Sequence, residues 1–206
     1  MNVTLFLWLL ASILLMVFFN AVSGKINYGY SRRNQLFAIL LNLLVWSGLY
    51  YKALRPIVDR GDSIPYPLAL LALITTILIS ITFIDLLYYE IPNSYNAIIA
   101  LLGIVYIFQA PQSLWVNLFL GGIIAFVAFL ILNIVSGGNL GMGDVKMVGG
   151  LGLFLGMNLL LNYIFITFLT GVVISIILLA FKVIGRKDKI AFGPYIGFGF
   201  IWMLIS

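Results

Sequence analysis

Two aspartates stand apart from the other charged residues of this 206-residue chain because each lies within or beside an apolar segment. Asp85 is embedded in "ITTILISITFIDLLYYEIPNSYN", and Asp144 follows the glycines of "GGNLGMGDVK". Ionisable side chains at membrane depth are costly, so each is a candidate for function. Two converging carboxylates can share one proton and activate a water molecule, as in aspartic proteases. The sequence therefore indicates Asp85 and Asp144 as an acid–base pair.

The residue types that the chain lacks exclude several other kinds of catalytic site. The sequence contains no cysteine and no histidine. Thiolate catalysis, serine–histidine catalysis and zinc sites built from cysteine or imidazole are therefore excluded. The glycines of "VSGGNLGMG" do not indicate a dinucleotide-binding loop, since no predicted strand precedes them. We expect neither a metal nor a cofactor, and the six carboxylates are the main candidates for acid–base chemistry.

Apolar segments that recur along the whole chain must position these aspartates. Hydrophobic residues make up 64% of the sequence and charged residues 8%, which indicates an integral membrane protein. Segments near bilayer-spanning length occur at 3–22, 67–88, 114–135 and 158–183, and shorter candidates at 36–51, 95–109, 145–156 and 193–205. The predicted fold class is an all-α membrane protein, a polytopic bundle of about eight transmembrane segments. A barrel is disfavoured because "LLALITTILISITFI" does not alternate apolar and polar residues.

The first apolar run resembles a secretory signal only loosely. Ala21-Val22-Ser23 imitates a signal-peptidase site, but no basic residue precedes the run. The run is also longer than the apolar core of a typical signal peptide. We therefore expect a retained first helix in a single domain, 1–206, without a soluble part.

The basic residues predict how the bundle is oriented. With eight segments, one side of the membrane carries Lys52, Arg55 and Arg60, and the other carries Lys25, Arg32, Arg33, Lys146, Lys182, Arg186, Lys187 and Lys189. The positive-inside rule places the larger group in the cytoplasm. The net charge of +5 is explained by this anchoring, and we expect no nucleic-acid partner.

Both aspartates are expected at cytoplasmic ends of membrane helices. The helix that carries Asp85 should end near Glu90, because Pro92 disfavours helical geometry in the residue before it. Asp85 would then lie about one and a half turns inside the helix, roughly 7–8 Å from its end. The glycines before Asp144 permit a close approach of the chain, and a new helix begins at "DVKMVGG".

Structural roles could also explain the acidic residues. Asp144 could be the N-cap of its helix, and Asp85 could be a buried partner of Lys146 or of an arginine. Glu90 could be a solvated residue at a helix end, and Lys146 could extend to the lipid headgroups. The remaining acidic side chains lie in polar segments and are expected to be solvated; they are Asp59, Asp62 and Asp188.

Three motifs together resemble the type IV prepilin peptidases, a family of GxGD membrane aspartyl proteases. The first is "GMGD", Gly141 to Asp144, followed by Lys146, and the second is "DLLYYEIPN", Asp85 to Asn93. The third is "KIAFGPYIGFG", which contains Gly193 and Pro194. They appear in the order that the family has. The resemblance covers 67–206, while 1–66 forms divergent N-terminal helices.

The resemblance implies both an activity and a set of site residues. Asp85 and Asp144 would be catalytic, with Asp144 as the resting base and Asp85 as the acid. Gly141, Gly143, Lys146, Glu90, Pro92, Asn93, Gly193 and Pro194 would be motif or supporting residues. Bifunctional members carry an insert with two CxxC pairs, whereas this chain has only "SGKINYGYSRRNQ" at that position. The resemblance therefore supports the peptidase and leaves the methyltransferase activity without support.

The implied substrate is a prepilin or pseudopilin, whose basic leader ends in glycine and precedes an apolar helix. The partners would then be this substrate and the lipid bilayer, and cleavage would occur near the cytoplasmic face of the cell membrane. Two alternatives remain open. One is a protease related to presenilin and signal peptide peptidase, although Ile84-Asp85 and Phe192-Gly193-Pro194 differ from their motifs. The other is an ion-coupled transporter that uses intramembrane aspartates.

Overall fold

The computed structural model describes residues 3–56, 66–185 and 188–205. Seven α-helices and no strand occur in these ranges, so the predicted all-α membrane class is confirmed. Asp59 and Asp62, which were expected to be solvated, are outside the described residues, and so are Arg60, Arg186 and Lys187. The helices are α1 Val3–Lys25, α2 Arg32–Leu49, α4 Tyr66–Tyr88, α5 Asn93–Gln109, α6 Trp115–Val135, α7 Met142–Ala180 and α8 Gly193–Ile205.

Five of the helices in the described ranges are long and apolar enough to cross a membrane: α1, α2 with its π-helical extension Tyr50–Leu54, α4, α6 with the short 3-10 turn Gln112–Leu114 before it, and α7. The helices α5 and α8 are shorter apolar helices. Polar and proline-containing turns separate these segments, which is why the predicted segment boundaries lie near the observed ones. The chain is therefore a multi-pass membrane protein.

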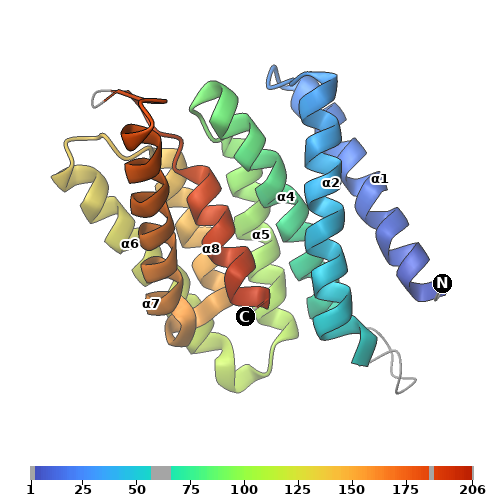
Figure 1. The fold of residues 1–206 in the computed structure, drawn as a ribbon. Coiled ribbons are helices and arrows are strands. Elements are labelled where there is room, and N and C mark those ends of the chain that lie inside the picture. Colours follow the sequence, from blue (N-terminus) through green and yellow to red (C-terminus); the bar gives the residue numbers. More distant parts are fainter. Residues whose placement is uncertain (1–2, 57–65, 186–187, 206) are drawn as a thin grey trace.

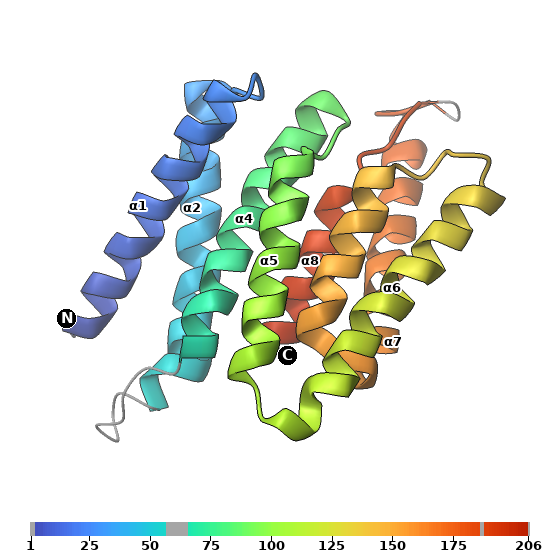
Figure 2. The same ribbon diagram turned by 180° about the vertical axis from the view of Figure 1, so that it is seen from behind.

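The predicted segments 145–156 and 158–183 correspond to the two parts of α7, which is interrupted at Gly156, whose φ is 62° and ψ is −179°. This backbone conformation is essentially restricted to glycine. The predicted count of eight membrane crossings is not confirmed, since five helices in the described ranges are long and apolar enough to cross. Figures 1 and 2 show that the two parts of α7 lie side by side and run in opposite directions.

The helices form one layered bundle (Figure 1). The pair α1 and α2 lies at one side, α6 and α7 lie at the other, and α4, α5 and α8 lie between them (Figure 2). Helix α4 is central, since it contacts α1, α2, α5 and α8, and its side chains of Ile74, Ile77 and Ile81 are fully buried. The end of α4 and the starts of α5, α7 and α8 meet at one end of the bundle, which is the upper end in Figure 1.

The predicted first helix includes the segment that imitates a signal-peptidase site. Residues 21–23 lie within α1, and Ser23 Oγ shares a hydrogen bond of 2.7 Å with the hydroxyl of Tyr95 in α5. Ser23 is fully buried. This part of α1 is therefore packed into the bundle.

Candidate active site

Asp85 lies on the last turn of α4. The helix ends at Tyr88, so Asp85 is about one turn from the helix end, nearer than the predicted one and a half turns. The reason is Tyr89, whose φ of 54° is in the left-handed region and stops the helix. The side chain of Asp85 is 5% exposed. The chain then turns through Ile91 and Pro92, which is the N-cap of α5.

Asp144 lies on the first turn of α7 but does not cap it. The N-cap is Gly141, without a side-chain cap, and Asp144 is the third helical residue, so the N-cap interpretation is wrong. Its N–H donates to the carbonyl of Gly141 over 3.0 Å. The side chain is 8% exposed, and its Oδ1 is buried without a hydrogen-bond partner among the described residues. A bound group that donates a hydrogen bond to that oxygen would satisfy it.

The two aspartates face the same space from different helices. Both line a cavity of about 280 Å³, together with Tyr89, Glu90, Ile91, Asn93, Gly141, Met142, Gly143 and Lys146. Both also line a second, larger cavity of about 710 Å³, which extends to the loops before α7 and α8. The structure therefore brings together Asp85, Asp144 and most of the predicted supporting residues.

The third motif contacts the first aspartate directly. The N–H of Gly193, the first residue of α8, donates to Asp85 Oδ2 over 2.8 Å. A Cβ at position 193 would lie 2.9 Å from the same oxygen, which is closer than real Cβ contacts. Only glycine allows the start of α8 to approach Asp85 in this way. Pro194 occupies the first turn of α8, where a missing N–H removes no helical hydrogen bond.

Close packing at Gly143 joins the other two motifs. A Cβ at position 143 would lie 2.9 Å from Cβ of Ile91. Asn96 Nδ2 in α5 donates to the carbonyl of Gly143 over 3.1 Å, so α5 holds the turn that precedes Asp144. Sequence reasoning missed Asn96, although an asparagine in the first turn of an apolar helix was a visible signal.

Lys146 and Glu90 lie at the rim of the smaller cavity. Lys146 Nζ donates to Asn93 Oδ1 over 2.7 Å. The observed donor to Asp85 is the N–H of Gly193, and not Lys146, which the sequence had offered as an alternative partner. Glu90 is exposed and lies near Tyr28 in the turn after α1. Desolvation raises the pKa of the Tyr28 hydroxyl, and the Glu90 carboxylate raises it further.

No group of three metal-ligating side chains occurs within the part of the chain that the structure describes. The arrangement offers two carboxylates, backbone amides and one lysine, which are the components of acid–base hydrolysis of a polar bond.

Comparison with known proteins identifies one family. The type IV leader peptidase family matches residues 72–176, a range that contains both Asp85 and Asp144. No curated protein and no solved structure matches the chain.

Proposed function

Because the chain belongs to the type IV leader peptidase family, we propose that it is a membrane aspartic endopeptidase that removes the leader peptide of type IV prepilins or pseudopilins. The observation that carries this proposal is the pairing of two buried carboxylates from α4 and α7 around one cavity. Paired carboxylates in a partly enclosed site are suited to activating a water molecule.

In this proposal, Asp144 and Asp85 hold one water molecule between them and share one proton. The oxygen of the water bonds to the scissile carbonyl carbon while Asp144 takes a proton from the water. At the same time, Asp85 donates its proton to the carbonyl oxygen. When the carbon–nitrogen bond breaks, the leaving amine takes the proton now on Asp144, and a hydroxyl of the intermediate gives its proton to Asp85, so that the dyad again holds one proton. No covalent bond between enzyme and substrate is required.

Charge placement supports a site at the cytoplasmic face. Helix α1 ends at Lys25, and α2 begins at Arg32. Figure 1 places these helix ends at the same end of the bundle as the end of α4 and the start of α7. By the positive-inside rule, this end of the bundle lies in the cytoplasm. Glu90, exposed at the cavity rim, is suited to bind the basic leader of the substrate.

Incubating the solubilised protein with a synthetic prepilin tests this proposal. The probe carries a basic leader ending in glycine and an apolar segment of about 20 residues. We expect a product whose new N-terminus is the residue after that glycine, identified by mass spectrometry, and no methyl group on it. A probe that stays intact, or that is cut elsewhere, would refute the proposed specificity.

A further inference from the structure

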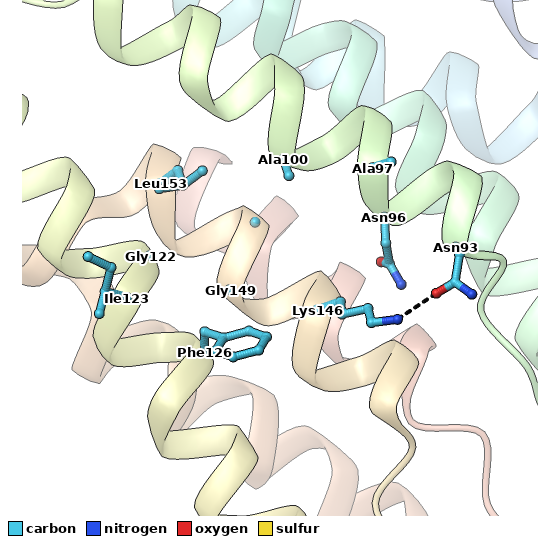
Figure 3. A pocket seen from close by; sticks show the side chains of 11 residues that line it. Asn93, Asn96, Ala97, Ala100, Gly122, Ile123, Phe126, Lys146, Gly149 and Leu153 are labelled. Atoms are coloured by element: carbon cyan, nitrogen blue, oxygen red, sulfur yellow. Dashed lines mark hydrogen bonds between the residues drawn. The ribbon is translucent and has the colours of Figure 1, made fainter.

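A separate groove opens beside the two aspartates, between α5 and α6. It has a volume of about 570 Å³, and its lining is almost entirely apolar. Figure 3 shows Asn96, Ala97 and Ala100 on α5 at one wall, Ile123 and Phe126 on α6 at the other, and α7 between them. Ile123 is 56% exposed, so the groove is open on the side of the bundle that faces lipid.

Glycines bring the walls of the groove close to its floor. A Cβ at Gly149 would lie 2.9 Å from Cβ of Phe126, and a Cβ at Gly150 would lie 2.9 Å from Cγ2 of Ile99. Both glycines belong to the first part of α7. Larger residues there would push α5 and α6 outward, so the groove depends on these close approaches.

The groove adjoins the smaller cavity of the candidate active site. Asn93 and Lys146 line both the groove and the smaller cavity that contains Asp85 and Asp144. On α7, the lining residues extend from Lys146 to Leu153. At 1.5 Å per residue, the groove reaches roughly 13 Å along α7 from Asp144. A chain lying in it would therefore have one end beside the two carboxylates.

One buried polar atom in the groove has no partner. Asn96 is 4% exposed, and while its Nδ2 donates to Gly143, its Oδ1 has no hydrogen-bond partner among the described residues. Figure 3 shows this side chain pointing from α5 into the groove, near the polar end formed by Asn93 and Lys146. A buried acceptor without a donor is costly. A bound group that donates a hydrogen bond here would satisfy it.

These features favour a peptide over a lipid chain. An acyl chain would fill the apolar part but would leave Asn96 Oδ1 without a donor. A peptide supplies backbone N–H groups beside apolar side chains. The larger cavity, which both aspartates line, also includes residues of polar loops such as Asn139 and Asp188. The groove is thus mainly apolar, whereas the larger cavity has polar and charged side chains beside the dyad.

We infer that the groove binds the apolar segment of the substrate adjoining the scissile bond, and that Asn96 Oδ1 accepts a backbone N–H of that segment. This inference rests on the proposed function, because it assumes that the dyad cuts a peptide. The polar side of the substrate would then occupy the larger cavity.

Filling the groove tests the inference through kinetics. The Ala97→Phe variant adds a ring at an exposed position of a groove wall, and Ala180→Phe adds the same ring at the exposed end of α7, outside the groove. Two probes are compared: the full prepilin and a short peptide that ends before the apolar segment. Ala97→Phe should reduce the ratio of kcat/KM for the long probe to that for the short probe by about tenfold, a typical effect of overfilling a packed site. Ala180→Phe should leave the ratio at its wild-type value.

Cross-linking locates the segment without requiring cleavage. The chain has no cysteine, so Ile123→Cys or Ala180→Cys is the only thiol in an Asp144→Asn background. A long probe with one cysteine about six residues after the scissile bond, near the middle of the groove, should form a disulfide with Ile123→Cys and not with Ala180→Cys.

The two experiments together separate the groove assignment from the proposed function. If wild-type protein cuts the probe, but the kcat/KM ratio is the same for Ala97→Phe and Ala180→Phe and both cysteine positions cross-link equally, the groove assignment is wrong and the proposed function stands. If wild-type protein leaves the probe intact, the proposed function fails, and the cross-link still decides whether the groove binds an apolar segment.

Discussion

The hydrogen bond from Gly193 to Asp85 is the contact on which the geometry of the candidate site most depends. It fixes one carboxylate oxygen at the N-terminus of α8, so that the other oxygen is left for water or substrate. Because a Cβ at position 193 would press on Asp85, we expect this glycine to act as a positioning residue.

We predict that Gly193→Ala lowers kcat by up to about tenfold and changes KM much less, because the added Cβ displaces the Gly193 N–H from Asp85 and weakens their hydrogen bond. The matched control is Gly197→Ala in the same helix, where the nearest atom to a new Cβ is Thr82 Oγ1 at an ordinary 3.5 Å. Cleavage kinetics and thermal unfolding of both variants check the prediction. Equal kcat values for the two variants would show that Gly193 does not position Asp85.

At this scale, the sequence predicts the residue types of the site better than their contacts. The motifs identified Asp85, Asp144, Gly143 and Gly193 as candidates, because charged and glycine residues are conspicuous in an apolar chain. They could not predict that Gly193 donates to Asp85, since the two residues are far apart in sequence and meet only through packing. Asn96 was missed for the same reason.

At the scale of elements, the interruption of α7 at Gly156 determines how the helix with Asp144 packs. The residue combines a positive φ with close contact to Asn117 and to Gly121 of α6. Hydropathy located the break, because the two predicted segments meet at this residue. It could not predict the sharp reversal between the two parts, which depends on the φ and ψ values of a single glycine.

Gly156→Ala should destabilise the protein by about 1–3 kcal/mol for the backbone conformation alone, with a further cost from the clash with the Asn117 side chain. Gly24→Ala is the control, because no atom lies within 4 Å of a Cβ there and its φ is not positive. Resistance to unfolding by sodium dodecyl sulfate measures the effect. A Gly156→Ala protein as stable as the Gly24→Ala protein would contradict the claim that the backbone conformation at position 156 requires glycine.

At the scale of the whole molecule, the proposed orientation follows from the two ends of the bundle. The turn between α6 and α7 lies at the end that holds the candidate site, and the turn between α5 and α6 lies at the opposite end (Figure 2). Asn139 and Gln112 are exposed residues of these turns. The positive-inside rule assigns Asn139 to the cytoplasm.

Single-cysteine labelling tests this assignment. A membrane-impermeant maleimide should label Asn139→Cys only in inside-out vesicles and Gln112→Cys only in intact spheroplasts. The absence of natural cysteines removes background labelling. The reverse pattern would place the candidate site on the outer face.

The fold class of the whole molecule was predictable from composition, because apolar segments near bilayer length leave few alternatives. The order of helices in space was not, since helix packing in a bilayer depends on small residues and polar contacts spread over several segments. The Trp8–Trp46 and Ser23–Tyr95 hydrogen bonds, which tie α1 to α2 and α5, are examples.

The most direct test of the central claim replaces each carboxylate of the dyad by its amide. Asp85→Asn and Asp144→Asn keep the side-chain volume but cannot share a proton, so each should reduce leader cleavage on the order of a thousandfold. Asp59→Asn changes an aspartate outside the three peptidase motifs and should cleave as the wild type does. All three variants should accumulate in membranes at equal levels. Cleavage at the wild-type rate by either dyad variant would contradict the account.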